Sequence, residues 1–282
     1  MKKILIPCDF SDTSESALKY AVAFAKYFSA DMVLLHVEMV PVVSPEMNIT
    51  PYAFGDMRED SLNALKNLSD KIKITEAFNG RIDYFSEMGH TPDIITEQVE
   101  KLNIDLVIMG ISGHGSSFMK NLVGSASVDV SKKITAPLII VPPGTVFKKV
   151  QNVAYACDYN PELILSTSLL TVKYLSTAFN AMLNIVHVVP ENHELTAEEA
   201  GLDNYIERKL ENSEHRTFIV NEKNTAHGIL SFITQHNIDM IIIEPKKHSL
   251  FHKLFSGSTT NQIAFNSPVP VLTIHGETVG EA

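Results

Sequence analysis

The second half of the chain repeats the sequence patterns of the first half, and this duplication limits the possible folds more than any other feature. Residues 153–159 repeat residues 5–10, with a Cys-Asp-aromatic triplet at an offset of 149. The four further matches, in the same order, are 185–188 with 35–37, 237–243 with 103–109, Gly257-Ser258 with Gly124-Ser125, and 270–274 with 137–141. Five ordered matches indicate two tandem domains of one fold, which we expect at 1–144 and 148–278 around a Pro-Pro-Gly linker.

Short apolar runs alternate with helical patterns in each half, as in a parallel α/β sheet. In the first half the expected strands are 3–9, 31–37, 82–85, 104–109 and 137–141. Helical patterns cover 58–74 and 94–102, and residues 38–60 are expected to form a loop. Asp12 and Glu15 fit a capping box that opens the helix after the first strand. The predicted fold class is therefore α/β, with two five-stranded parallel sheets flanked by helices.

Composition narrows the function classes. The net charge is −10, and both halves are acidic. Residues 1–147 carry 13 basic and 18 acidic side chains, and residues 148–282 carry 10 basic and 15 acidic ones. This even acidic balance argues against a nucleic-acid partner, because nucleic-acid binders usually have a basic patch. No apolar run approaches the roughly 20 residues of a membrane-spanning helix, and the N-terminus does not resemble a signal peptide, so we expect a cytoplasmic protein. Two cysteines are too few for a disulfide scaffold or a zinc site.

The stretch 104–127 carries the clearest ligand-binding pattern. A buried strand runs into a glycine-rich turn, and a helix pattern begins at Gly124-Ser125. Free backbone N–H groups in such a turn favour a phosphate, although an ordinary strand-to-helix loop has the same composition. The turn is not a P-loop, because Ser116 stands in place of the lysine, and Phe118 breaks the dinucleotide signature. No nucleophile elbow is present, so the sequence predicts no catalytic residue.

Other candidate residues have two readings. Asp9 follows the first strand, where α/β sheets bind ligands, but it also suits a helix start. Cys8 and Cys157 fit small buried residues better than redox sensors. His248 and His252 are four apart, yet neighbouring lysines oppose a cation, so we predict surface histidines and no metal site.

Together these patterns resemble the universal stress protein family over nearly the whole chain. The resemblance is carried by the first strand KILIPCDFS, the strand LLHV, the helix start near Gly89, and IDLVIMG with its glycine loop. The family signature is G-x2-G-x9-G-[ST]. Gly110 and Gly113 fit it, but ten residues rather than nine precede Gly124, so Gly113 and Gly115 compete for the second glycine position.

The resemblance implies tandem Rossmann-like domains of the adenine nucleotide α hydrolase-like type, and an ATP site in the first domain, with Mg²⁺ as a possible companion. The implied contacts with adenine and ribose are Pro7, Cys8, Asp9 and Val37. The implied contacts with ribose and phosphates are Met109, Gly110, Gly113 or Gly115, Gly124, Ser125 and Ser127. It further implies a nucleotide-dependent stress regulator with an unknown protein partner, and at most slow ATP hydrolysis.

The second half departs from the signature, because Glu244 and Lys247 fall where the first two glycines belong. A carboxylate there would repel phosphate, so we expect poor or no nucleotide binding in this half. The resemblance also implies an intramolecular pseudo-dimer paired through the fifth strands, near 137–141 and 270–274, or a homodimer of the chain. The alternative is a nucleotide-free scaffold that binds a protein or an apolar small molecule.

Overall fold

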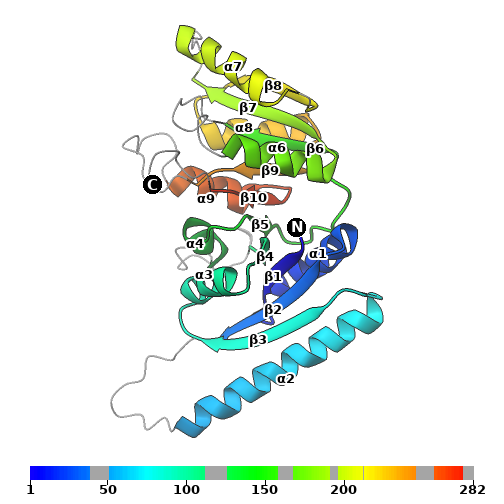
Figure 1. The fold of residues 1–282 in the computed structure, drawn as a ribbon. Helices are drawn as coiled ribbons and strands as arrows, with labels where there is room; N and C mark the ends of the chain where they lie inside the picture. Colours follow the sequence, from blue (N-terminus) through cyan, green and yellow to red (C-terminus); the bar gives the residue numbers. More distant parts are fainter. Residues whose placement is uncertain are drawn as a thin grey trace, which may run out of the picture. The chain divides into compact units, whose positions relative to one another are not determined.

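The computed structural model describes residues 1–38, 51–111, 126–157, 168–190, 196–211, 213–245 and 257–275. These residues form two compact units that divide between Phe147 and Lys148 (Figure 1). Within the described ranges, no helix has both the length and the apolar character needed to cross a membrane.

The first unit is a five-stranded parallel sheet in the order β3-β2-β1-β4-β5. Its elements are β1 (Lys3–Pro7), α1 (Asp12–Phe28), β2 (Asp31–Glu38), α2 (Pro51–Thr75), β3 (Ile82–Met88), α3 (Thr91–Lys101), β4 (Leu106–Gly110), α4 (Ala126–Lys133) and β5 (Leu138–Val141). Strands β1, β4 and β5 are almost fully buried, as expected for a parallel sheet covered by helices on both faces. The predicted fold class is confirmed for this half.

Two local predictions in the first unit need correction. The N-cap of α1 is Ser11 rather than Asp12, because the Ser11 side chain accepts a hydrogen bond from the Ser14 backbone N–H. Asp12 and Glu15 instead lie in the first helical turn, where their charges favour the helix dipole. Helix α2 begins at Pro51, inside the stretch predicted as a loop, and proline is well tolerated in the first turn of a helix.

The second unit repeats this arrangement, with strand order β10-β9-β6-β7-β8. Its elements are β6 (Asn152–Ala156), α6 (Ser168–Phe179), β7 (Met182–Val189), α7 (Ala197–Lys209), β8 (His215–Asn221), α8 (Thr225–Gln235), β9 (Met240–Ile243), α9 (Gly257–Asn266) and β10 (Val271–Thr273). Each strand matches one of the first unit in order and direction, so the sequence repeat is a repeat of the fold.

In each unit, an equivalent aspartate links two neighbouring strands at their amino ends. The Asp105 carboxylate accepts hydrogen bonds from the Lys2 and Lys3 backbone N–H groups at 2.6 and 2.9 Å. Asp239 accepts from Gln151 and Asn152 at 2.9 and 3.0 Å. Partial burial works to raise the pKa of each carboxyl. The backbone hydrogen bonds, preceded at Asp239 by the Lys148 ammonium 2.7 Å away, outweigh it and hold each pKa below its usual value.

The end of the linker packs on the first unit. Measured between ring centroids, Phe147 lies 5.4 Å from Tyr20, 5.5 Å from Phe24 and 5.7 Å from Tyr27, three residues of α1. The first two contacts are edge-to-face, an arrangement that stabilises aromatic pairs beyond simple burial. The three α1 rings therefore fix the linker at Phe147.

Candidate functional site

The strand order places a natural ligand site in the first unit between β1 and β4. From β1 the chain proceeds to β2 and β3 on one side, and from β4 it proceeds to β5 on the other. Ligands of open α/β sheets bind at such a reversal, beyond the carboxyl ends of the strands. The residues following β1 and β4 therefore border the candidate site.

The turn after β1 carries three of the predicted site residues. Pro7 ends the strand, Cys8 is buried at 3% exposure, and Asp9 is exposed. The Asp9 carboxylate accepts hydrogen bonds from both the backbone N–H and the hydroxyl of Ser11, at 3.0 and 2.6 Å. Asp9 thus shapes the turn itself, as the helix-start reading expected, while remaining accessible to a ligand.

The thiol of Cys8 is poorly suited to redox chemistry. Burial, together with the neighbouring Asp9 charge, raises its pKa to about 12, and its Sγ donates to the Ile6 carbonyl oxygen at 3.3 Å. Only the thiolate is an effective nucleophile. Cys157 is likewise buried, as the sequence predicted for both cysteines.

The end of β2 adds Val37 and a polar group that the sequence reasoning had not selected. His36 Nδ1 lies 2.6 Å from the Cys8 carbonyl oxygen, and its Nε2 lies 3.6 Å from Glu38 Oε1. The same carboxylate oxygen accepts a short hydrogen bond from the Ser61 hydroxyl of α2. The sequence did contain a signal that could have identified His36, because this residue recurs in the second half as His187. The His187 Nδ1 lies 3.1 Å from the Cys157 carbonyl oxygen, as in the equivalent contact of the first unit.

The end of β4 contributes Met109 and Gly110. Met109 is buried, and the following Ile111 continues the pairing with β5 through its N–H bond to Val141. A Cβ at Gly110 would lie 2.7 Å from the Thr13 carbonyl oxygen and 2.8 Å from Thr13 Cγ2. Glycine is therefore required here for the close approach of α1, independently of any ligand.

The remaining predicted site residues lie beyond the glycine loop or within it. Ser127 is in α4 and is buried at 1% exposure. Gly113, Gly115, Gly124 and Ser125 lie outside the described residues, and the extra residue of the loop lies there with them.

In the second unit, Glu244 follows β9 at the place that Gly110 occupies after β4. Its Oε1 accepts a hydrogen bond from the Ser168 hydroxyl of α6 at 2.8 Å. The carboxylate expected in the path of a nucleotide is thus bonded to a helix of its own unit. Asp158, Lys246, Lys247, His248 and His252 lie outside the described residues.

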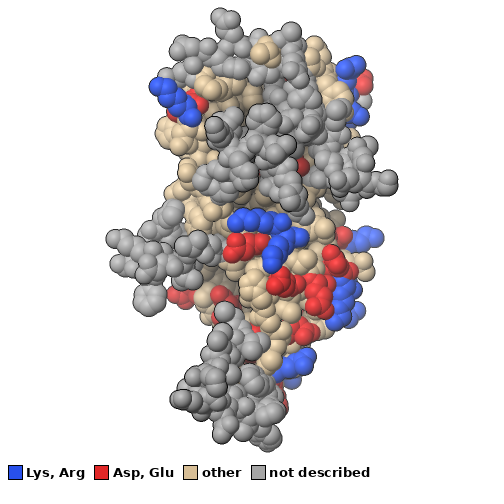
Figure 2. All heavy atoms as spheres, turned by 90° about the vertical axis from the view of Figure 1, so that its left-hand side faces the viewer, with Lys and Arg blue, Asp and Glu red and all other residues tan. Residues whose placement is uncertain are grey.

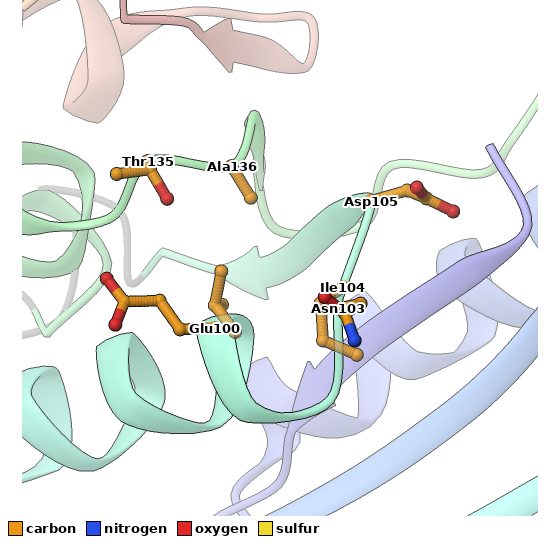
Figure 3. Close-up of a pocket in the computed structure, with 7 residues that line it drawn as sticks. Glu100, Asn103, Ile104, Asp105, Thr135 and Ala136 are labelled. Carbon is orange, nitrogen blue, oxygen red and sulfur yellow. The ribbon is translucent and has the colours of Figure 1, made fainter.

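A hollow of about 360 Å³ lies at the end of β4 opposite to the candidate site (Figure 3). It is lined by residues of α3, the segment leading into β4 and the segment before β5: Val99, Glu100, Asn103, Ile104, Asp105, Thr135 and Ala136. The Asp105 carboxylate in this lining accepts hydrogen bonds from two backbone N–H groups. The hollow lies at the amino end of β4, whereas ligands of open α/β sheets bind at the carboxyl ends of the strands, so we do not assign it to the candidate site.

Where Figure 2 shows charged side chains, those of opposite sign lie close together. In the described surface, Asp93 pairs with Lys133 and with His90 when that ring is protonated, and these two partners lower its pKa. Exposed pairs of this kind contribute little to stability. Among the described residues, no group of three or more His, Cys, Asp and Glu side chains could hold a metal ion.

Comparison with known proteins agrees with this architecture. The model of the universal stress protein family matches residues 1–142 and 168–275, and the chain belongs to this family. A universal stress protein of Methanocaldococcus jannaschii is 31% identical over 142 residues, which are 50% of this chain and 81% of that protein. A second one from the same organism is 27% identical over 157 residues, or 50% of this chain and 94% of that protein.

A solved structure supports the tandem arrangement. The crystal structure of a universal stress protein from Archaeoglobus fulgidus aligns with a TM-score of 0.70 at 22% identity, covering 97% of this chain and 96% of that one. At this identity the likeness concerns the fold alone. The predicted family and tandem fold are therefore confirmed. The identity of a ligand depends on the chain's own residues.

Proposed function

We propose that the first unit binds ATP or a related adenine nucleotide at the carboxyl ends of β1, β2 and β4. The observation that carries this proposal is the meeting of β1 and β4 at the reversal of strand order, with the exposed Asp9 after β1 and Gly110 as the last residue of β4. Membership in the universal stress protein family, through residues 1–142, supports it. The proposed ligand contacts are those that the family resemblance implies, with the glycine loop holding the phosphates.

The residues present fit a nucleotide better than a catalysed reaction. Asp9 is accessible and could accept hydrogen bonds from a ribose hydroxyl, while buried Met109 and half-buried Val37 offer apolar surface near the same edge. In the described part of this edge, Asp9 already accepts two hydrogen bonds from Ser11. We therefore propose a nucleotide-dependent regulator, in which occupancy stabilises a surface that a partner protein reads, rather than a fast enzyme.

The test is calorimetric titration of the full chain with ATP and Mg²⁺, together with ATP-induced thermal stabilisation. Asp9→Ala and Gly124→Asp should each abolish the response, and Asp158→Ala is the matched control in the second half. Absence of any response of the wild-type chain at millimolar ATP contradicts the proposal. Phosphate release that is unchanged in Asp9→Ala would identify any ATPase activity as contamination.

A second arm addresses the nucleotide-free alternative. Native mass spectrometry of the purified chain should detect a bound adenine nucleotide whose occupancy is lost in Gly124→Asp. A retained mass of another kind, equal in wild type and variant, would favour the scaffold function instead.

A further inference from the structure

His36 fixes the turn that carries Cys8, Asp9 and Phe10 from the neighbouring strand. Because a carbonyl oxygen can only accept, the 2.6 Å contact means that His36 Nδ1 donates its hydrogen to the Cys8 carbonyl. The Cys8 N–H in turn donates to the Leu35 carbonyl at 2.8 Å. Cys8 is thus held through both of its backbone groups by consecutive residues of β2.

The His36 ring also supports the residue after Asp9. Its centroid lies 4.9 Å from that of Phe10, with an angle of 35° between the rings. Phe10 has a left-handed backbone conformation, with φ of +61°, although its side chain is bulky and 48% exposed. Such a conformation costs energy and persists only where surrounding contacts impose it. His36 therefore contacts the residues on both sides of Asp9.

On its far side the ring faces Glu38. His36 Nε2 lies 3.6 Å from Glu38 Oε1, which is too far for a hydrogen bond, and the Glu38 carboxylate accepts a hydrogen bond from the Ser61 hydroxyl of α2. The side chains of His36 and Glu38 are only 14% and 11% exposed. The side chains of Glu38 and His36 thus lie next to each other in a largely buried position between α2 and the Cys8 turn, and close packing there restricts the conformations available to the His36 ring.

We propose that His36 is a positioning residue for the nucleotide, which it need not touch: its Nδ1–H and ring hold Cys8 and Phe10 so that Asp9 stands ready for the ligand. The inference rests on the proposed nucleotide site of the first unit. It predicts that His36 governs recognition of the nucleoside part, whereas the glycine loop governs the phosphates. A ligand without a nucleoside should therefore be insensitive to His36.

Two substitutions separate the hydrogen bond from the ring. His36→Phe keeps an aromatic ring beside Phe10 but removes the donor, and His36→Asn keeps a donor near the position of Nδ1 but removes the ring. Loss of a buried hydrogen bond should weaken ATP and adenosine binding about tenfold in His36→Phe. His36→Asn should stay within about threefold of wild type for the same reason. His187→Phe is the matched control, since His187 makes the equivalent contact in the second unit.

Calorimetry with ATP, adenosine and inorganic tripolyphosphate, each on the full chain, tests the inference. The expected result is weaker binding of the two nucleoside ligands and unchanged binding of tripolyphosphate. Hydrogen exchange of the nucleotide-free chain gives an independent readout, because the amides of residues 8–11 should exchange faster in His36→Phe and at the wild-type rate in His187→Phe.

Three outcomes overturn the inference. One is wild-type ATP affinity in His36→Phe, which leaves the proposed function intact. Another is equal weakening of all three ligands, which would indicate a general structural role. The third outcome concerns the case in which His36→Phe does not fold, so that His36→Asn is the variant that decides. A tenfold loss of ATP affinity in His36→Asn, with unchanged exchange of the amides of residues 8–11, would then overturn the inference. A wild-type chain that binds none of the ligands removes the proposed function together with the inference.

Discussion

At the amino ends of the strands the two units are alike, and at the carboxyl ends they differ. Asp105 and Asp239 make the same pair of backbone hydrogen bonds, and Asn103 and Asn237 share a left-handed conformation with φ of +50° and +51°. Both halves have thus kept the groups that link neighbouring strands. This indicates that both units depend on the same structural contacts for their fold.

The carboxyl ends have diverged in chemistry while keeping their backbone. The Glu38 carbonyl accepts from the Gly89 N–H at 3.0 Å, and the Val189 carbonyl accepts from Glu222 at 2.9 Å, so Glu38 and Val189 occupy equivalent places. Gly110 likewise corresponds to Glu244. The first unit therefore has a buried carboxylate where the second is apolar, and a glycine where the second has a carboxylate. Such differences at this edge are expected if only one half retains the ligand.

The largest effect is expected from giving the second unit the carboxylate of the first. Val189 is 3% exposed, and Val189→Glu would bury an ionisable group in an apolar position. We expect a loss of roughly 3 kcal/mol or more in the free energy of unfolding, measured by denaturant titration of the full chain. The reverse change, Glu38→Val, removes one acceptor from Ser61 and should cost about 1 kcal/mol. Equal costs for the two changes would contradict the distinction between the units.

A second test concerns the glycine after β4. A Cβ at Gly110 would come within 2.7 Å of the Thr13 carbonyl oxygen, so Gly110→Ala should destabilise the first unit by about 1–3 kcal/mol. Faster hydrogen exchange in β1 and β4, but not in β6 and β9, would locate the effect. Gly201→Ala is the control, because a Cβ at Gly201 meets nothing within 4 Å. Its helical position in α7 predicts no loss, and up to about 1 kcal/mol of gain.

These comparisons also show where sequence reasoning succeeded. Four of the five ordered matches fall on parallel strands of both units, because buried strands leave continuous apolar runs, whereas β3 and β8 lie outside the matches. The N-cap of α1 was predicted one residue too late. Ser11, Asp12 and Ser14 are all plausible caps by residue type, and only the geometry selects Ser11. The start of α2 was missed because proline and small polar residues suit a loop as well as a helix start.

The candidate site was predicted less completely than the fold. Asp9 and Gly110 could be proposed as site residues because a position at the end of a strand and a glycine are visible in sequence. The contact of His36 with Cys8 joins residues 28 apart, and the hydrogen bond from Ser61 to Glu38 spans 23 residues, so neither has a local pattern. The role of Gly110 toward Thr13 was equally hidden, since the sequence gives the glycine but not the helix that approaches it.

A smaller effect, with a defined pH dependence, is expected at the shared aspartates. Because the folded pKa of Asp105 and Asp239 lies below the unfolded value near 3.8, each contributes stability above that value and loses it as the pH falls through the folded pKa. Asp105→Asn and Asp239→Asn should each cost about 1–2 kcal/mol at pH 7 through weakened hydrogen bonds. Denaturant titrations from pH 7 to pH 2 should show each variant converging with wild type in acid. A cost independent of pH would contradict the assigned hydrogen bonds.

The smallest effect should be the same in both units. Asn103 and Asn237 follow α3 and α8 with positive φ, which asparagine tolerates better than other residues that carry a Cβ. Asn103→Ala and Asn237→Ala should each cost about 1 kcal/mol in the free energy of unfolding, whereas the glycine variants should be nearly neutral because glycine adopts this conformation without strain. Denaturant titration of the four variants would test this. A clear cost at one asparagine alone would mean that the shared scaffold, as well as the carboxyl edge, has diverged.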